Sequence, residues 1–212
     1  MRSTNAWQGQ TLRCRAQYST MPIDTSAPHR VVVVGSSCAG KSTFARALSE
    51  ARGDSHIELD ELYWSHAWQP KPEAEFLRLV EGATAGTAWV AAGNYSPARE
   101  LLWNRATTIV WLDLSLSRVL LRGLRRSLRR IVGGEPLFHG NRETLRRTFF
   151  SRESILWWIV TTFHRRRREF TQLRSADEFQ HLTWFHARTP SEAQGILETL
   201  ARSGVPSADR RI

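Results

Sequence analysis

Nine consecutive residues carry the clearest chemical signal in the chain, because the first eight of them fit the pattern G-x-x-x-x-G-K-[ST] of a phosphate-binding loop, or P-loop. They are Gly35, Ser36, Ser37, Cys38, Ala39, Gly40, Lys41, Ser42 and Thr43. Glycines let the backbone wrap a phosphate chain, and successive N–H groups then point at the anion. Lys41 is expected to reach the β- and γ-phosphates of a nucleotide, and the Ser42 hydroxyl is expected to ligate Mg²⁺.

The residues on either side of this loop are of the kind that a P-loop requires. Four consecutive valines, Val31 to Val34, are typical of a strand buried on both faces of a parallel sheet. Residues 44–48, which follow the loop, read as the opening of a helix. A glycine- and serine-rich turn that fits by chance is the alternative, and the agreement of strand, loop and helix argues against it.

The rest of the chain alternates between strand-like and helix-like segments. Strands are expected at 31–34, 55–60, 88–92, 107–113 and 181–186. Helices are expected at about 40–51, 73–81, 97–103, 116–132, 141–174 and 190–202. Strands that alternate with helices at this spacing predict a three-layer α/β fold with a parallel sheet.

Ligands of such sheets bind at the carboxyl ends of the strands, so the residues that close each strand are candidates for chemistry. Asp60 closes the second expected strand and is a candidate to orient or deprotonate an acceptor hydroxyl in phosphoryl transfer. Its alternative role is an N-cap for the segment that follows. Gly93 and Asn94 close the third strand. Asp113 closes the fourth, where a helix begins at once, so capping is the favoured interpretation there.

Composition limits the class of protein. A chain of 212 residues with 41% hydrophobic residues is long enough for one domain with a real core. Its net charge of +10 is concentrated between residues 118 and 174, where fifteen arginines face four acids. Such a block favours phosphate-rich ligands, nucleic acid or an anionic membrane surface. Only two cysteines are present, so a disulfide framework is disfavoured and a reducing cytoplasm is expected.

Arginine recurs at helical spacing between residues 118 and 130, opposite a stripe of leucine and isoleucine. One interpretation is a solvated basic face. The other is a helical lid whose arginines fold over the transferring phosphoryl group and neutralise its charge. Arg122, Arg126 and Arg142 are the candidates for this catalytic role.

Residues 165–168 are four consecutive arginines, which cannot all share one face of a helix. They are therefore expected to form a solvated or nucleic-acid-binding cluster rather than part of a catalytic site. The nearby Trp157 and Trp158 favour packing in a core or at a homodimer surface over stacking on bases.

The sequence predicts one domain with a short extension at each end. Residues 1–28 are expected to be a disordered extension, with Met21 as the preferred true start, because the segment lacks the apolar region of a secretion signal. Residues 29–205 form the expected domain, with the lid at about 116–174, and 206–212 form a disordered tail. The most apolar stretch, 155–163, is about half as long as a membrane span requires.

Several of these segments together resemble a known family. From about residue 30 to 174 the chain is similar to the adenylate-kinase-like P-loop proteins labelled DNA topology modulation proteins. The resemblance is carried by residues 35–43, 56–64, 93–96, 109–114 and 140–143. It implies a nucleoside-monophosphate-kinase-type core with strand order 2-3-1-4-5, and it implies ATP and Mg²⁺. It does not imply a known phosphate acceptor.

One position departs from what the resemblance implies. In related kinases the third strand commonly ends in Asp-Gly, and that aspartate stands behind the Mg²⁺ shell. Ala92 precedes Gly93 here, so the carboxylate is missing. Asp60 is then the first candidate to hold the metal together with Ser42, since some small-molecule kinases of this class place a metal-contacting aspartate at the end of strand two. Asp113 is the second candidate.

Three functions remain open at this point. The first is an ATP-dependent kinase that phosphorylates a small molecule or a nucleotide. The second is a nucleotide-dependent protein that binds nucleic acid through the arginine block. The third is a catalytically impaired P-loop regulator, suggested by Ala92. Convergence of arginines on one phosphate favours the kinase, whereas an extended stripe favours nucleic acid.

Overall fold

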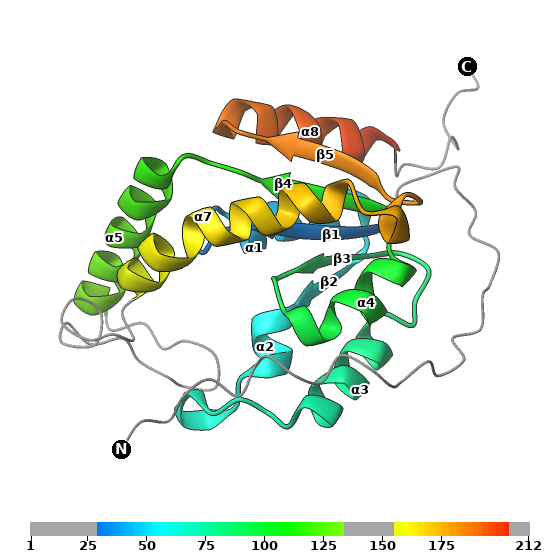
Figure 1. The fold of residues 1–212 in the computed structure, drawn as a ribbon, viewed down its shortest axis with the longest axis horizontal. Helices are drawn as coiled ribbons and strands as arrows, with labels where there is room; N and C mark the ends of the chain where they lie inside the picture. The colour runs from blue at the N-terminus through cyan, green and yellow to red at the C-terminus, as the bar shows by residue number, and fades with distance from the viewer. Residues whose placement is uncertain (1–28, 134–154, 204–212) are drawn as a thin grey trace.

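The computed structural model describes residues 29–133 and 155–203 of the chain (Figure 1). Five parallel strands form one sheet in the order β2-β3-β1-β4-β5. The strands are β1 (Arg30–Gly35), β2 (Ser55–Glu58), β3 (Trp89–Ala92), β4 (Thr108–Leu112) and β5 (Thr183–Ala187). The valine run lies in the central strand β1, which pairs with β3 on one side and β4 on the other. Every residue of this strand after Arg30 is buried, as expected for a strand covered on both faces.

Helices cover both faces of this sheet and complete the three layers. They are α1 (Lys41–Arg52), α2 (Leu59–Tyr63), α3 (Glu73–Ala83), α4 (Ser96–Arg105), α5 (Leu116–Gly133), α7 (Ile155–Arg174) and α8 (Pro190–Ser203). Two short 3₁₀ turns, His66–Trp68 and Asp177–Phe179, lie between them. The three-layer fold and the strand order expected from the sequence are therefore confirmed.

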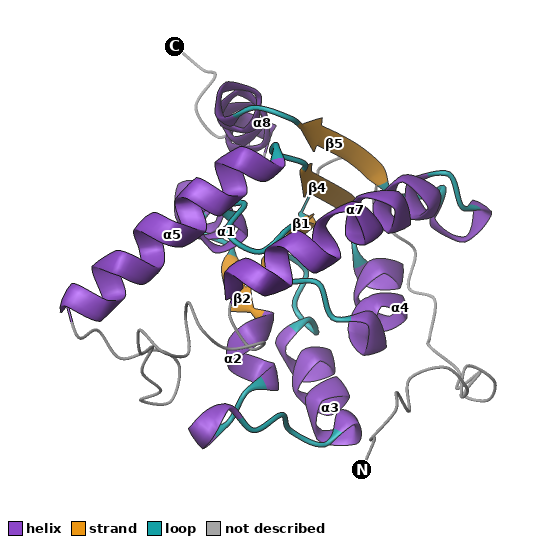
Figure 2. Cartoon of the chain, turned by 60° about the vertical axis from the view of Figure 1, so that its left-hand side comes forward, coloured by secondary structure: helices purple, strands orange, loops and turns teal. Residues whose placement is uncertain are grey.

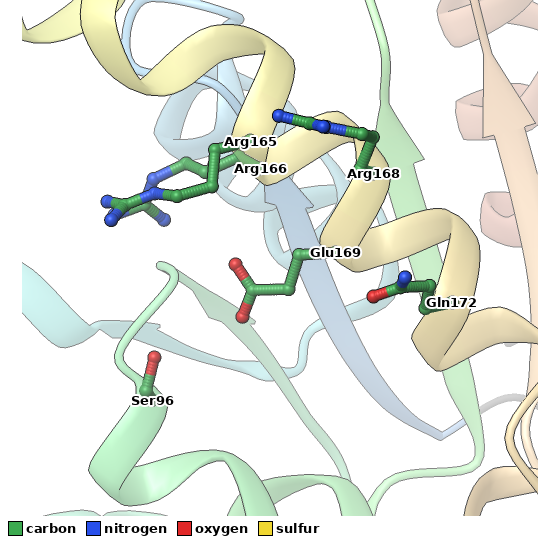
Figure 3. Close-up of a pocket in the computed structure, with 6 residues that line it drawn as sticks. All are labelled: Ser96, Arg165, Arg166, Arg168, Glu169 and Gln172. Carbon is green, nitrogen blue, oxygen red and sulfur yellow. The ribbon is translucent and has the colours of Figure 1, made fainter. Parts of the chain in front are cut away.

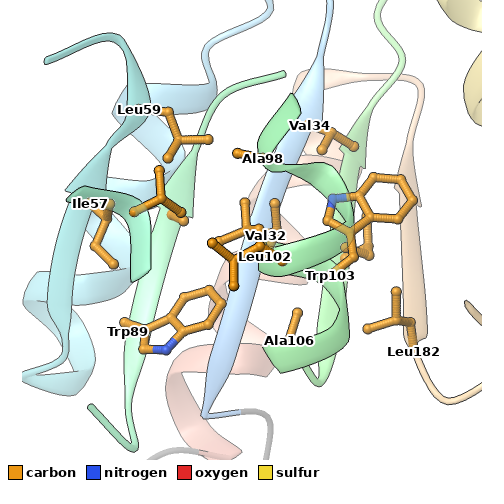
Figure 4. Close-up of a cluster of buried hydrophobic side chains, with 14 of the residues drawn as sticks. Val32, Val34, Ile57, Leu59, Trp89, Ala98, Leu102, Trp103, Ala106 and Leu182 are labelled. Atoms are coloured by element: carbon orange, nitrogen blue, oxygen red, sulfur yellow. The ribbon is translucent and has the colours of Figure 1, made fainter. Parts of the chain in front are cut away.

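Two hydrophobic cores lie on opposite faces of the sheet. The first contains Val32 and Val34 of β1 and packs them against α3 and α4, with Val32 and Leu102 in the middle of the cluster (Figure 4). The second contains Val31 and Val33 and packs them against α1 and α8. Alternate valines of one strand thus point to opposite faces, as the period of two in a strand requires.

Helix α7 belongs to both cores, because it runs across the carboxyl edge of the sheet. Ile159 and Phe163, in its first half, are buried in the core on the α1 side. Phe170, in its second half, is buried in the core on the α4 side, where its ring stacks near that of Trp103. The four arginines 165–168 lie between these anchors, so the fold carries them over the ends of the strands. Figures 1 and 2 show α5 beside the first half of α7, beyond the sheet.

The second strand is shorter than the sequence suggested. It ends at Glu58, and the next two residues begin α2, so Asp60 lies in the first turn of a helix and not at a strand end. The physical reason is that the partner strand β3 ends at Ala92, opposite Glu58, which leaves no ladder to continue. Carboxylates at Asp60 and Glu61 in this first turn also suit the positive end of the helix dipole.

The fifth strand begins two residues later than expected, at Thr183. The expected extensions at 1–28 and 206–212, and the lid segment 134–154 with Arg142, lie outside the described residues. None of the helices in the described ranges is both long and apolar enough to cross a membrane.

Candidate active site

The nine residues of the P-loop motif join β1 to α1 in a backbone conformation that only some residues adopt easily. Gly40, the residue before α1, has a φ of 101°, in the left-handed region that favours glycine. Cys38 also has a positive φ, of 62°, although it carries a side chain. These turns direct the chain around the N-terminus of α1, which is an anion-binding position.

Lys41 closes this loop from within. Its Nζ donates to the carbonyl oxygens of Gly35 at 3.2 Å and Ser36 at 3.1 Å. Burial lowers the pKa of the Lys41 ammonium, and the negative charge of Asp60 partly opposes that shift. The ammonium is thus held at the loop by neutral carbonyls, and these contacts can be exchanged for phosphate oxygens.

Glu58, the last residue of β2, is the acidic group that lies beside Ser42. Its side chain is hydrogen-bonded to Ser42, and only 7% of its surface is exposed. Burial raises the pKa of the Glu58 carboxyl to about 7, the Ser42 contact lowers it, and the nearby Asp60 adds to the rise. The motif residue expected to ligate Mg²⁺ is therefore already paired with a carboxyl group.

Ala92 lies where the sequence placed it, at the end of β3 and directly beside Glu58. The register pairs Ala92 with Glu58 on one side and with Val33 of β1 on the other. Paired residues of parallel strands send their side chains to the same face, so the small Ala92 leaves room for the carboxyl of Glu58. The acid that is missing from β3 is present one strand further out.

Asp60 interacts electrostatically with Lys41 and is held in place by Tyr95. The Tyr95 hydroxyl donates to Asp60 Oδ1 at 2.6 Å. Burial raises the pKa of Tyr95, and the charge of Asp60 raises it further, so the hydroxyl keeps its proton. No hydrogen bond from the residues described here reaches Asp60 Oδ2.

Asn94 fastens the end of β3 to the start of the P-loop. Its Nδ2 donates to the Gly35 carbonyl, and its Oδ1 accepts from the Gly35 N–H at 3.2 Å. Gly93, beside it, has a φ of 148°, and a Cβ there would lie 2.7 Å from the Leu59 side chain. This close approach brings the Tyr95 loop against the start of α2, and it positions Tyr95 for Asp60.

Arg122 is the predicted lid residue that contacts the loop. Its Nη1 donates to the Ala39 carbonyl at 2.8 Å and lies beside Gly40. Arg126, one helical turn later in α5, has a buried Nε for which the described residues supply no hydrogen-bond partner. Arg142 is outside the described residues. Two of the three predicted arginines therefore lie on α5, and Arg122 directly touches the P-loop.

The four arginines 165–168 were expected to form a solvated or nucleic-acid-binding cluster, but they do not all face solvent in the same way. Arg166 is half-buried and interacts electrostatically with Lys41. Burial lowers the pKa of the Arg166 guanidinium, the charge of Glu169 opposes that shift, and the charges of Arg165 and Arg99 add to it. Arg167 donates from Nε to Asp113 Oδ2 at 3.0 Å.

Asp113 is an anchor for α7 and β5. Its Oδ2 also accepts from His186 Nε2 at 3.1 Å, and the His186 ring stacks on Trp111 at 4.3 Å. Helix α5 begins at Leu116, so Asp113 does not immediately precede it and is not the helix cap that was expected. Its Oδ2 is instead shared by Arg167 and His186.

The described residues contain no group of three or more acidic, histidine or cysteine side chains arranged to hold a metal by themselves. Mg²⁺ does not need such a group, because it is commonly bound by one or two carboxylates, waters and the phosphates of the substrate. Glu58 is hydrogen-bonded to Ser42 and interacts electrostatically with Asp60, and these three residues fit that donor set. The sequence had named Ser42 and Asp60, and it had not named Glu58.

The pKa of Glu58 leads to a pH prediction for the nucleotide site. A carboxyl must be ionised to support Mg²⁺, so binding is expected to release a proton below pH 7. A group with a pKa of about 7 passes from roughly one-tenth to nine-tenths ionised between pH 6 and 8, so Mg²⁺–ATP affinity is expected to rise about tenfold. Calorimetry of the wild-type protein and Glu58→Gln over this range measures the effect.

Glu58→Gln is the control, because its Mg²⁺–ATP affinity should keep only the pH dependence that comes from ATP itself. In the ligand-free protein, folding stability changes with pH in the opposite direction to Mg²⁺–ATP affinity. The folded state keeps the Glu58 proton up to about pH 7, whereas the unfolded chain loses it near 4.5, so stability falls as pH rises across that window. Equal pH dependence of Mg²⁺–ATP affinity in both proteins would contradict the role assigned to Glu58.

Comparison with known proteins gives likenesses of fold alone. No family model and no curated protein sequence matches the chain. A shikimate kinase from Acinetobacter baumannii in complex with shikimate is 18% identical, over 86% of this chain and 97% of that one, with a TM-score of 0.49. A shikimate kinase from Aquifex aeolicus is 17% identical, over 81% of this chain and 95% of that one, with a TM-score of 0.47. A gluconokinase from Sinorhizobium meliloti is 20% identical, over 82% of this chain and 94% of that one, with a TM-score of 0.46. At these values the likeness says nothing about the substrate.

Proposed function

We propose that this chain is an ATP-dependent phosphotransferase that moves the γ-phosphate of Mg²⁺–ATP to a hydroxyl of a small molecule or nucleotide. One observation carries the proposal: the Lys41 ammonium is hydrogen-bonded to the phosphate-binding loop and also interacts electrostatically with the Asp60 carboxylate. Phosphoryl transfer needs the two reactants on opposite sides of the group in flight, with positive charge between them.

The donor half of the proposed site is the loop of residues 35–43. Its backbone N–H groups and the start of α1 face the phosphates, and Lys41 exchanges its two carbonyl contacts for β- and γ-phosphate oxygens. Ser42 would hold Mg²⁺, with Glu58 behind it. The metal supplies charge neutralisation on the phosphates, and Glu58 supplies the carboxylate that Ala92 cannot.

The acceptor half is centred on Asp60. Tyr95 holds one carboxylate oxygen, and the other accepts the hydrogen bond of the acceptor hydroxyl and aims that hydroxyl at the γ-phosphorus. As the new P–O bond forms and the bond to ADP breaks, the hydroxyl proton passes to Asp60. Arg122, Arg126 and Arg142 are proposed to neutralise the charge that spreads over the equatorial oxygens.

The arrangement of the arginines favours this function over nucleic-acid binding. Arg122 contacts the P-loop, Arg166 interacts with Lys41, and Arg167 is paired with Asp113. These groups converge on the carboxyl edge of the sheet, whereas a nucleic-acid surface requires an extended stripe of free cations. Glu58 likewise favours an active enzyme over an impaired regulator. Membership of the adenylate-kinase-like DNA topology modulation family is part of the same proposal.

Release of ADP in the presence of Mg²⁺ and a panel of nucleosides, nucleotides, sugars and hydroxy acids tests the proposed reaction. We expect at least one acceptor to raise ADP release well above the rate with water alone. Lys41→Ala serves as the control for contaminating kinases. Duplex DNA that binds with a steep salt dependence, without any acceptor-dependent ADP release, would favour the nucleic-acid function instead.

Exchange of a carboxylate between two strands tests how Glu58 works. Glu58→Ala is expected to lower Mg²⁺-dependent turnover about 10–100-fold, the usual effect of losing a group that supports a metal. Ala92→Asp in the same protein places an acid on the adjacent strand, about 4.8 Å away, and is expected to recover part of the loss.

Ala92→Asp alone is the matched control. It puts a second carboxyl beside buried Glu58, so we expect it to lower the melting temperature and raise the pKa of the pair without raising turnover. If the double variant is no more active than Glu58→Ala, the two positions do not serve the same metal.

A further inference from the structure

An open pocket lies between α7 and the start of α4, and the chemistry proposed above does not use the arginines that line it. Its volume is about 520 Å³, and it is lined by Ser96, Arg165, Arg166, Arg168, Glu169 and Gln172. Figure 3 shows the side chains of Arg165 and Arg166 extending from α7 in the same direction, while Glu169 points toward Ser96. All of these residues except Ser96 come from the part of α7 that crosses the carboxyl edge of the sheet.

The pocket has an excess of positive charge. Glu169, its one acid, is already paired with Arg99 of α4. Among the described residues no carboxylate forms an ion pair with Arg165, Arg166 or Arg168, and Arg168 donates only to the backbone carbonyl of His164, at 3.4 Å. Arg166 lies over the ring of Trp158, 5.9 Å from its centroid, which holds the guanidinium without neutralising it. Arg166 is half-buried, and the carboxylate that acts on it, Glu169, is shared with Arg99, so an anionic ligand would stabilise the three guanidinium groups.

The pocket adjoins the acceptor half of the proposed site. Ser96 directly follows Tyr95, whose hydroxyl is bonded to Asp60. Arg166 is close enough to Lys41 to lower the pKa of its ammonium. A molecule in this pocket therefore contacts the residue next to Tyr95 and the guanidinium that acts on Lys41.

We infer that the acceptor carries an anionic group, a carboxylate or a phosphate, in addition to its reacting hydroxyl, and that Arg165, Arg166 and Arg168 bind this group. The inference rests on the proposed function for its assignment to the acceptor. Guanidinium groups suit both anions, because their planar N–H donors match two oxygens at once. The Ser96 hydroxyl and the Gln172 amide supply further polar contacts. The α7 arginines thus select among acceptors, and those of α5 serve the transferring phosphate.

Binding of simple anions tests the pocket directly. The full chain is saturated with Mg²⁺ and the non-hydrolysable ATP analogue AMP-PNP, so that the P-loop is filled, and its melting temperature is followed at constant ionic strength. Inorganic phosphate and acetate replace chloride in separate arms, which distinguishes a phosphate site from a carboxylate site. We expect one of the two anions to raise the melting temperature with a saturable dependence on concentration.

Four variants locate that effect. Arg165→Gln and Arg166→Gln are each expected to raise the half-saturating anion concentration about 10–100-fold, the usual loss for one charge-assisted hydrogen bond. Arg174→Gln, at an exposed arginine of the same helix outside the pocket, is expected to behave as wild type. Lys41→Ala, measured without AMP-PNP, is expected to retain the anion effect, because that effect belongs to α7 and not to the P-loop.

The outcomes separate this inference from the proposed function. If neither anion shifts the melting temperature, or if Arg166→Gln and Arg174→Gln respond alike, the pocket does not bind anions and the inference fails. If AMP-PNP does not bind the wild-type protein, the proposed function fails, and the Lys41→Ala arm still reports on the pocket.

In the acceptor panel, ADP release must be faster with glycerate or glycerol 3-phosphate than with glycerol, or with AMP than with adenosine. Preference for the neutral member of both sets also overturns the inference.

Discussion

Lys41→Ala is expected to lower ATP affinity by about 10²–10⁴-fold while the protein remains folded. The lysine would make two charge-assisted contacts to phosphate oxygens, each worth about 1.5–3 kcal/mol, and a factor of ten in affinity corresponds to about 1.4 kcal/mol. Its present partners are two loop carbonyls, which water can satisfy when the side chain is removed. Calorimetry with Mg²⁺–ATP measures the loss, and the melting temperature shows whether the fold is intact.

Burial lowers the pKa of the Lys41 ammonium, so keeping this charge in the folded protein is unfavourable. The variant is therefore expected to be as stable as wild type without ligand, or more stable. Lys41→Met keeps the apolar stem and is the matched control for packing. A folded Lys41→Ala protein that binds Mg²⁺–ATP as tightly as wild type would remove the P-loop from the proposed site.

Asp60→Asn is expected to lower turnover about 10²–10⁴-fold with little change in ATP affinity. The amide keeps the shape of the side chain and can still accept the Tyr95 hydrogen bond, but it cannot take up the acceptor proton, and proton transfer of this kind contributes a factor of that size. The loss should appear in kcat, because the contact strengthens as the transition state forms. Single-turnover kinetics with the acceptor found in the ADP-release panel measures it.

Tyr95→Phe separates orientation from proton transfer. It removes the hydroxyl that holds Asp60 Oδ1 and leaves the carboxylate itself, so a smaller loss than in Asp60→Asn is expected. Equal and large increases in the Mg²⁺–ATP dissociation constant in both variants would show that Asp60 serves the metal rather than the acceptor. Unchanged turnover in Asp60→Asn would show that neither role applies.

The sequence identified the P-loop and the layers because these depend on local patterns. A valine run, a glycine-rich loop and a helix start are each encoded within a few residues, and strands that alternate with helices specify a parallel sheet. The order of the strands came from the family resemblance, and the structure confirms it.

Glu58 was missed because its role depends on pairing between strands. Within the expected strand 55–60 it looked like one polar residue among several, and the closing acid, Asp60, attracted the assignment. The structure ends the strand at Glu58 because β3 ends opposite it. A signal was present, since an acid flanked by Ile57 and Leu59 in a buried strand needs a partner.

Arg166 was missed for a different reason. Consecutive residues of a helix are rotated by about 100°, so four adjacent arginines cover most of the circumference and one of them must face the protein. Which one does so depends on where α7 crosses the sheet, and that is set by Phe163 and Phe170 in two separate cores. No local pattern around residues 165–168 contains this information.

The membership of α7 in both cores has a mechanical consequence. A helix fixed at Phe163 in one core and at Phe170 in the other behaves as a stiff beam supported at two points, with the arginines on the span between them. An anion that binds Arg166 exerts a force on α7 that both cores must resist. A change of packing near α8 would in turn shift the first half of the helix. A change of packing on the sheet face that α1 and α8 cover can therefore move the guanidinium groups of the pocket through α7. This holds although no side chain of that core lines the pocket.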